Sequence, residues 1–86
     1  MASDYSVIFS SLTLLVYVKE HNIFSKFQKA VRHLKADIRY PSLQVELMEP
    51  KQDGIYSFRV DKKYRGLFFF NKNGEIEVFA ITNHYK

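Results

Sequence analysis

The chain has 86 residues, which suffices for one domain spanning residues 1–86 and leaves no room for a second. Hydrophobic residues make up 47% of the sequence and aromatic residues 16%, and this apolar content excludes a disordered chain. Without cysteine, the protein can form neither a disulfide nor a cysteine-based zinc site, and its three histidines lack metal-ligand spacing. We therefore expect no metal and no cofactor.

Two features of the sequence predict a cytoplasmic protein with no membrane association. The longest apolar run, residues 14–18, is far shorter than the roughly 20 residues that a transmembrane helix needs. The N-terminus has no basic region ahead of an apolar stretch, so it does not have the pattern of a secretory signal.

The positive charge of the chain is concentrated in one segment. The formal net charge is +4, with an isoelectric point near 9.4. Residues 22–40 contain five basic residues and one acidic residue, whereas the rest of the chain carries eight of each. A localised basic face indicates a polyanionic partner, although an ordinary solvated helix face would have the same composition.

The first elements in chain order are a strand and a helix. Alternating apolar residues predict a strand over residues 5–9. Ser10 and Ser11 follow, and a serine hydroxyl can cap the first turn of a helix by accepting a hydrogen bond from a backbone N–H. Apolar residues at helical spacing predict that helix over residues 12–19, although its β-branched content would also suit a strand.

The second helix has the clearest pattern in the sequence. Apolar residues recur at steps of three and four from Phe24 to Ile38 and form one stripe, with basic residues around it. Pro41 should end the helix, because the residue before a proline is pushed out of helical geometry. His33 lies beside the stripe, and we interpret it as an ordinary surface or boundary histidine.

From Ser42 onward the period of the pattern changes to two, which predicts four strands: one beginning near Ser42, then residues 55–61, 64–70 and 75–82. Asn73-Gly74 predicts a type I′ hairpin turn between the last two. The order of one strand, two helices and four strands predicts an α+β domain with two N-terminal helices packed on a curved antiparallel sheet.

Alternation along the strands also predicts which side chains face away from the helices. If the aromatic residues of the strand 55–61 face the helices, Ser57 and Arg59 face away, and Glu46 does the same in the preceding strand. Burying an unpaired guanidinium is costly, so Arg65 should point outward as well. The charged groups would then converge on the open face of the sheet, where they could also be no more than a cross-strand ion-pair network.

Four short segments, taken in order, resemble signatures of the RelE/ParE toxin superfamily: Pro41-Ser42-Leu43, Gly54-Ile-Tyr-Ser-Phe-Arg-Val60, Tyr64-Arg65 and the terminal His84-Tyr85. The match covers about half of the chain, and the ordered set is specific where no single segment is. Within the superfamily the chain is similar to the YoeB-like branch, which also ends in a His-Tyr pair. The resemblance implies the toxin of a type II toxin–antitoxin system. In that branch the toxin is a metal-independent endoribonuclease that cleaves mRNA in the ribosomal A site.

The resemblance also implies roles for individual residues. RNA carries its own nucleophile, the 2′-hydroxyl beside the scissile phosphate, so the enzyme has only to move protons and stabilise negative charge. Glu46 matches the general base of the branch, and Arg65 matches the arginine that braces the phosphate. His84 would be the general acid, because an imidazole can donate a proton near neutral pH. Tyr85 would stack on or orient the nucleotide, and Arg59 would support the phosphate or position the base.

Other basic residues are expected to bind substrate. Lys51 would be a remnant of the lysine-rich catalytic set of the RelE branch. The basic residues of the second helix would contact phosphates of the ribosome and mRNA in a salt-sensitive manner: Lys26, Lys29, Arg32 and Lys35.

The expected protein partner is an antitoxin. Parity places Leu67 and Phe69 on the open face of the sheet, where an exposed apolar pair needs a cover. We expect an acidic amphipathic segment to fold across it, with operator DNA bound only through the antitoxin complex. Gly66 is expected to leave a gap beside Arg65. Two alternatives stay open: a ParE-like inhibitor of DNA gyrase that cleaves no RNA, and a degenerate relative that only binds its partner.

Overall fold

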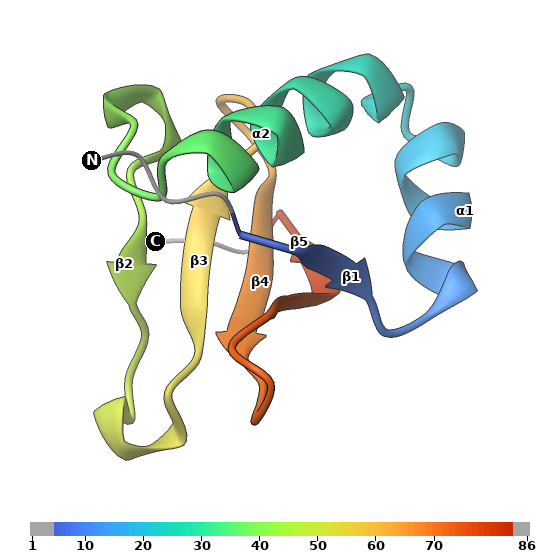
Figure 1. The fold of residues 1–86 in the computed structure, drawn as a ribbon. Helices are drawn as coiled ribbons and strands as arrows, with labels where there is room; N and C mark the ends of the chain where they lie inside the picture. The colour runs from blue at the N-terminus through green and yellow to red at the C-terminus, as the bar shows by residue number, and fades with distance from the viewer. Residues whose placement is uncertain (1–4, 84–86) are drawn as a thin grey trace.

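The computed structural model describes residues 5–83. Two helices pack against a five-stranded sheet (Figure 1). In chain order the elements are β1 (Val7–Phe9), α1 (Leu12–Glu20), α2 (Phe24–Ala36), the 3₁₀ helix η1 (Pro41–Leu43), β2 (Glu46–Leu47), the 3₁₀ helix η2 (Lys51–Asp53), β3 (Tyr56–Arg59), β4 (Arg65–Phe70) and β5 (Ile76–Thr82). The predicted order of one strand, two helices and four strands is confirmed.

The sheet is mixed, which corrects the prediction of a purely antiparallel one. Its strands lie in the order β1-β5-β4-β3-β2, and β2 to β5 form an antiparallel meander. β1 pairs with β5 in parallel, with Val7 opposite Ile76. The two helices carry the chain from β1 to the far edge of the sheet, so the meander returns to β1 with its last strand. The α+β class is confirmed.

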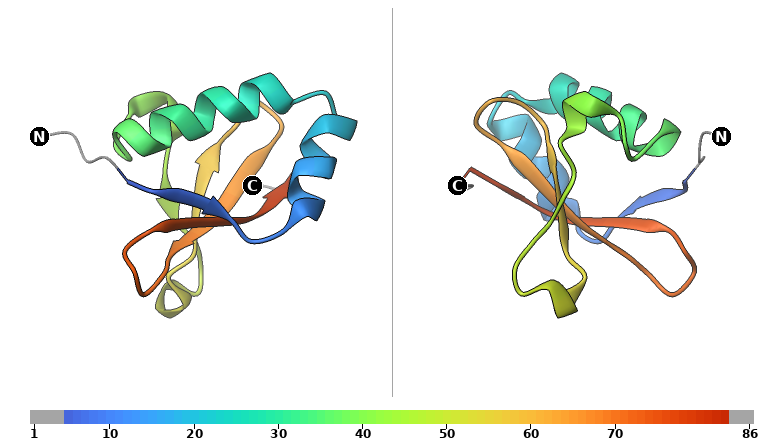
Figure 2. Two further views of the ribbon diagram at one scale, coloured as in Figure 1. Left: turned by 45° about the vertical axis from the view of Figure 1, so that its right-hand side comes forward. Right: turned by 90° about the vertical axis from the view of Figure 1, so that its left-hand side faces the viewer.

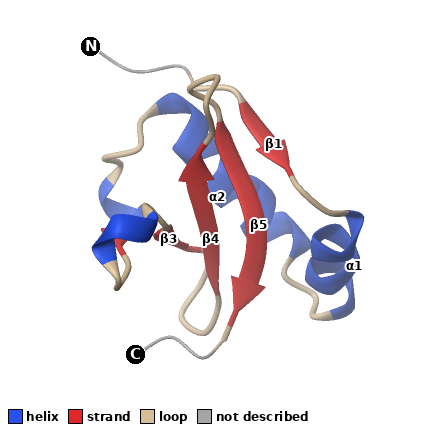
Figure 3. Ribbon diagram, turned by 90° about the horizontal axis from the view of Figure 1, so that it is seen from below, coloured by secondary structure: helices blue, strands red, loops and turns tan. Residues whose placement is uncertain are grey.

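The helices cover the sheet unequally. α2 runs across one face of the twisted sheet (Figure 2), whereas α1 lies beyond β1 at the edge, as the view from below shows (Figure 3). The core between α2 and the sheet includes Phe27 and Leu34 of the helix and Phe58, Phe68 and Val78 of the strands, none more than 2% exposed. Burying side chains of this kind contributes roughly 1.5–3 kcal/mol each. In the part of the chain that the structure describes, no helix is long and apolar enough to cross a membrane.

The ends of the helices differ in how well the sequence predicts them. The Ser11 hydroxyl accepts a hydrogen bond from the Thr13 backbone N–H at 3.1 Å, so the predicted cap of α1 is confirmed. α2 ends at Ala36, two residues before the predicted end. Pro41–Leu43 form η1, although a strand was predicted to begin near Ser42. β2 is therefore reduced to two residues.

The turn between β4 and β5 is not the predicted type I′ turn. Gly74 has a φ of 78°, but Asn73 is not among the residues with positive φ. The Asn71 carbonyl accepts from the Gly74 N–H, and the Asn71 side-chain oxygen accepts from the N–H groups of Asn73 and Glu75, all at 2.9 Å. A three-residue loop with a single left-handed glycine thus replaces the two-residue turn, because the Asn71 side chain satisfies the N–H groups of the loop.

Candidate functional site

Arg65, the first residue of β4, is the only buried charged residue among residues 5–83, with 5% of its surface exposed. Its Nε and Nη2 atoms donate to the Ser57 hydroxyl at 3.1 and 2.8 Å, and Nη2 also donates to the Gln44 carbonyl. Parity placed Arg65 on the face away from the helices, and its pairing with Arg59 confirms that face. The expected exposure is wrong, because hydrogen bonds offset much of the cost of burying the guanidinium.

Both groups that hold Arg65 are themselves held by the backbone. Ser57 is fully buried in β3 and lies on the same side of the sheet as Arg59, two residues later. Gln44 ends η1 in the left-handed region, with a φ of 46°, and its carbonyl accepts from Arg65. Sequence parity gave a signal for Ser57, which it placed on the outer face. It gave none for Gln44, because the position of a backbone carbonyl does not depend on the side-chain pattern.

Gly66 leaves no gap beside the arginine, which corrects the expectation from sequence. It pairs with Phe58, and a Cβ at Gly66 would overlap the Phe58 ring. The glycine therefore faces the core, where the ring lies against the β4 backbone. This close contact fixes how β4 lies beside β3, and it therefore fixes the position of Arg65.

Glu46 and Arg59 lie on the same face as Arg65. Glu46 pairs with Ser57 across β2 and β3, and Arg59 pairs directly with Arg65. Burial lowers the pKa of the Arg65 guanidinium, the Glu46 carboxylate raises it, and Arg59 lowers it. An arginine stays protonated despite such shifts, so the arrangement concentrates permanent positive charge beside one carboxylate.

A cavity of about 400 Å³ borders this group. It is lined by Gln44, Arg59, Asp61, Lys62, Lys63 and Arg65. Four of these side chains are cationic and one is anionic, so the cavity favours a ligand that carries negative charge and accepts hydrogen bonds. A phosphate has both properties, and the planar fork of an arginine suits it.

The loop between β3 and β4 is organised by Asp61. One Asp61 carboxylate oxygen accepts from the N–H groups of Lys63 and Tyr64 at 2.8 Å, and the other lies 3.4 Å from Lys26 Nζ. Partial burial raises the pKa of this carboxyl, but the backbone hydrogen bonds and Lys26 more than offset that effect, so the pKa lies below its usual value. The loop is thus tied to α2 on one side of the cavity.

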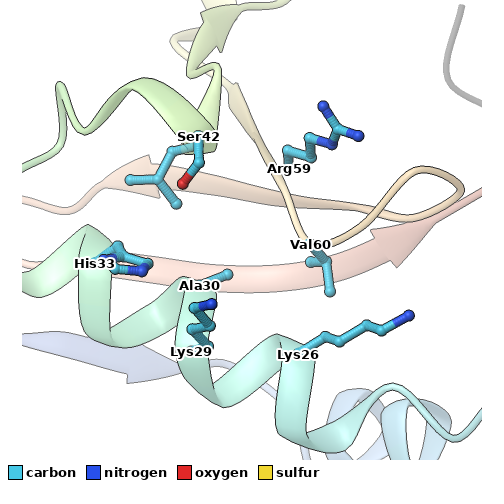
Figure 4. A pocket seen from close by; sticks show the side chains of 8 residues that line it. Lys26, Lys29, Ala30, His33, Ser42, Arg59 and Val60 are labelled. Atoms are coloured by element: carbon cyan, nitrogen blue, oxygen red, sulfur yellow. The ribbon is translucent and has the colours of Figure 1, made fainter.

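The basic residues of α2 do not form the single face that the sequence suggested. Lys26 and Lys29 line a pocket of about 260 Å³ between α2, η1 and the end of β3 (Figure 4). Arg32 and Lys35 line a different groove, of about 430 Å³, on the flank toward β1. The helical period of 3.6 residues places the two pairs on different flanks of α2. Residues 26, 29 and 33 lie along one flank, and residues 28, 32 and 35 lie along the other.

One further predicted site residue lies apart from Arg65, and two lie outside the described residues. Lys51 is exposed in η2, at the opposite end of β3 from Arg59 (Figure 1). His84 and Tyr85 fall outside the described residues. The last described strand ends at Thr82, which pairs with Arg65.

The apolar surface is also distributed differently from the expectation. Leu67 and Phe69 lie in β4 but are half-buried, and the Phe69 ring packs on Phe79 with centroids 5.8 Å apart. Sequence parity could not foresee this, because Phe79 comes from β5. Large apolar side chains are exposed on β1 and α1, where Leu12 is 79% exposed and Val16 52%.

Comparisons with known proteins agree on the fold. The YoeB dimer from Staphylococcus aureus superposes with a TM-score of 0.65 at 16% identity, covering 96% of this chain and 100% of that one. The YoeB/ParE toxin from Agrobacterium tumefaciens gives 0.66 at 18% identity, covering 93% and 99%. The YoeB–YefM complex from S. aureus gives 0.61 at 19%, covering 94% and 98%. No model of a protein family matches the chain, and no curated protein matches it in sequence.

These superpositions define the class of structure. The chain has the α+β fold of YoeB and YoeB/ParE toxins, over nearly its whole length and theirs. The fold that the short segments led us to expect is thereby confirmed.

Proposed function

We propose that this protein is the toxin of a type II toxin–antitoxin system and an endoribonuclease that cleaves mRNA in the ribosomal A site without a metal. The observation that carries the proposal is the Arg65 guanidinium, held by Ser57 and Gln44 beside a cationic cavity on a YoeB-like fold. A preorganised cation of this kind stabilises the charge that develops on phosphorus during an in-line attack.

The proposed reaction is a transfer within the RNA strand. Glu46 takes the proton of the 2′-hydroxyl, and the resulting oxygen attacks the adjacent phosphorus. The bond from phosphorus to the 5′-oxygen breaks, that oxygen takes a proton from His84, and a 2′,3′-cyclic phosphate remains. Arg65 and Arg59 would stabilise the negative charge on the phosphate oxygens, and Tyr85 would orient the nucleotide.

The sequence supports a role for His84. His84 follows Thr82 by two residues, and Thr82, the last residue of β5, pairs with Arg65. A proton donor on the leaving-group side is what the proposed reaction requires.

The test is controlled expression in bacteria, with growth, mRNA cleavage by primer extension and DNA supercoiling followed in parallel. We expect growth arrest with cuts inside codons, and we expect both Arg65→Ala and His84→Ala to lose them while their thermal melts show a folded protein. Arg39→Ala is the matched control, since Arg39 is exposed and pairs only with Asp37 among the described residues. Arrest with altered supercoiling and intact mRNA would support the gyrase inhibitor instead. No arrest at all would favour a degenerate relative.

We further propose that an antitoxin segment of acidic, amphipathic character neutralises the toxin. The S. aureus YoeB neighbour is found in a complex with YefM. On this chain, Phe9 of β1 and Leu15 of α1 line the groove bordered by Arg32 and Lys35, which thus combines apolar surface with positive charge. Leu12 and Val16 are exposed on the same helix, α1. Such a surface suits an acidic amphipathic segment better than the half-buried Leu67 and Phe69.

The antitoxin proposal is tested with the product of the adjacent gene. We expect Leu12→Ser with Val16→Ser to weaken its binding more than Leu67→Ser with Phe69→Ser, because exposed apolar anchors lose the larger contact. If the substitutions at Leu67 and Phe69 weakened binding more, the antitoxin would bind the open face of the sheet instead.

A further inference from the structure

The pocket on the α2 flank opposite β1 has a composition that the proposed reaction does not explain. We name it the α2–β3 pocket, and it is lined by Lys26, Lys29, Ala30, His33, Ser42, Leu43, Arg59 and Val60. Three of its side chains are cationic, a hydroxyl and an imidazole add polar atoms, and the other three are apolar. Figure 4 shows Lys26, Lys29 and His33 on α2, with Ser42, Val60 and Arg59 across the pocket from the helix.

Arg59 connects this pocket to the one at Arg65, because its side chain lines both. The two cavities therefore share Arg59 as a bordering residue. A chain of phosphates that placed one group at Arg65 could continue past Arg59 into the α2–β3 pocket. Only a polyanion with regularly spaced charges would use both cavities at once.

Several contacts give the α2–β3 pocket a defined shape. His33 stacks on Tyr40 with ring centroids 3.9 Å apart and planes inclined by 22°, which sets the plane of the imidazole. Lys26 is tethered to Asp61 at 3.4 Å, so it stays at the side of the pocket toward the β3–β4 loop. Within residues 5–83 Lys29 forms no ion pair that it would have to break before it meets an anion, and it lies between Lys26 and His33 on the same flank of α2.

The opposite flank of α2 provides the contrast. The groove that contains Arg32 and Lys35 is also lined by Phe9, Leu15, Phe24 and Val31. Five of its eight lining residues are apolar and two are cationic, whereas three of the eight around the α2–β3 pocket are cationic and two more are polar. Two lysines on one helix, Lys29 and Lys35, therefore occupy different surroundings and form a matched pair for experiment.

From these observations we infer that the α2–β3 pocket binds a second phosphodiester of the same single-stranded RNA whose scissile phosphate lies at Arg65. The inference rests on the proposed function and extends it, since it assigns the path of the strand beyond the scissile bond. A phosphodiester of ribosomal RNA has the same chemistry, and the experiment separates these two sources because it contains no ribosome.

The experiment measures the binding of short RNA oligonucleotides by fluorescence anisotropy, with a 2′-deoxy sugar at the scissile position to prevent cleavage. As the oligonucleotide is lengthened one nucleotide at a time, the affinity of the wild type should rise in a step when the added phosphate reaches the pocket. Lys29→Gln should remove this step, weaken binding roughly threefold to tenfold and reduce the slope of log affinity against log salt by about 0.7. Lys35→Gln should retain the step.

A neutral methylphosphonate at the added position provides the second arm. It should remove the step in the wild type and in Lys35→Gln, and cause no further loss in Lys29→Gln, because one contact cannot be lost twice. Both lysines are exposed, and thermal melts of the variants check that the fold is retained.

The outcomes separate this inference from the proposed function. Identical behaviour of the two lysine variants, or no step in the wild type at low salt, would overturn the subsite even if mRNA is cleaved in cells. A step that depends on Lys29 in a protein that cleaves no mRNA would uphold the subsite and overturn the nuclease.

Discussion

Two groups of cations on this protein differ in how they are held. Arg65 is buried on the outer face of the sheet, and three hydrogen bonds to Ser57 and Gln44 fix its guanidinium. The basic residues of α2 are exposed on a helix, and of these Lys26 alone has an ion pair within residues 5–83. A fixed charge needs no reorganisation when a reaction develops charge beside it, whereas an exposed lysine gains affinity through long-range attraction that salt screens.

The two kinds of cation differ in what their positions depend on. A buried guanidinium depends on the core packing beneath it, so its position is sensitive to changes several residues away. Solvent-facing lysines depend only on the helix that carries them.

Arg65→Lys should have the largest effect. The substitution keeps a positive charge but loses the planar fork. A single ammonium group cannot donate to both Ser57 and Gln44 in the geometry of the guanidinium. We expect the cleavage rate to fall about 100- to 1000-fold, as for other single preorganised donors. Rates of mRNA cleavage in a reconstituted translation system measure this, with Arg39→Lys as the control. A lysine variant as active as the wild type would mean that charge alone suffices.

Gly66→Ala tests how tightly the core is packed beneath Arg65. The added Cβ would overlap the Phe58 ring, which is fully buried and has little room to move. We expect a loss of about 1–3 kcal/mol in the free energy of unfolding, measured by urea denaturation, as for other overpacked cores. Ser25→Ala, at an exposed position of α2, should change stability by less than about 0.5 kcal/mol. Equal stability of the two variants would show that the ring moves aside without cost.

Ser57→Ala removes the hydroxyl that accepts two of the hydrogen bonds of Arg65 while leaving the guanidinium in place. We expect kcat to fall about tenfold with a smaller change in KM, because a loss of about 1–1.5 kcal/mol is typical of such a bond. The effect should shrink when Arg65 is already lysine, and a double-mutant cycle measures this coupling. Independent, additive losses would indicate that Ser57 acts only on stability.

The smallest effect concerns Asp61, which ties the β3–β4 loop to the exposed Lys26. The pKa of Asp61 is lowered in the folded protein, so its contribution to stability is present above the unfolded pKa of about 3.9 and is lost as the pH falls through the lower, folded pKa. Because Lys26 is 61% exposed, we expect the ion pair to contribute less than about 1 kcal/mol.

Asp61→Asn keeps an oxygen for the backbone hydrogen bonds and removes the charge. Its free energy of unfolding should therefore change less steeply with pH below about 4 than that of the wild type, as thermal melts across a pH series would show. Parallel pH profiles for the two proteins would contradict the assigned shift.

From the sequence alone we could predict the order of the elements, the extent of α2 to within two residues, the cap of α1 and the face of the sheet on which Glu46, Arg59 and Arg65 lie. Each of these depends on local properties: the period of apolar residues, a hydroxyl before a helix, or the alternation of side chains along a strand.

Only the tertiary structure decided the rest. The parallel pairing of β1 with β5, the burial of Arg65 under the Gln44 carbonyl and the packing of Phe69 on Phe79 all join segments distant in sequence. The division of the α2 cations between two flanks depends on what packs on each side of the helix. The spacing of apolar residues indicates which side of a helix or strand faces the core, but it does not indicate which segment covers the other side.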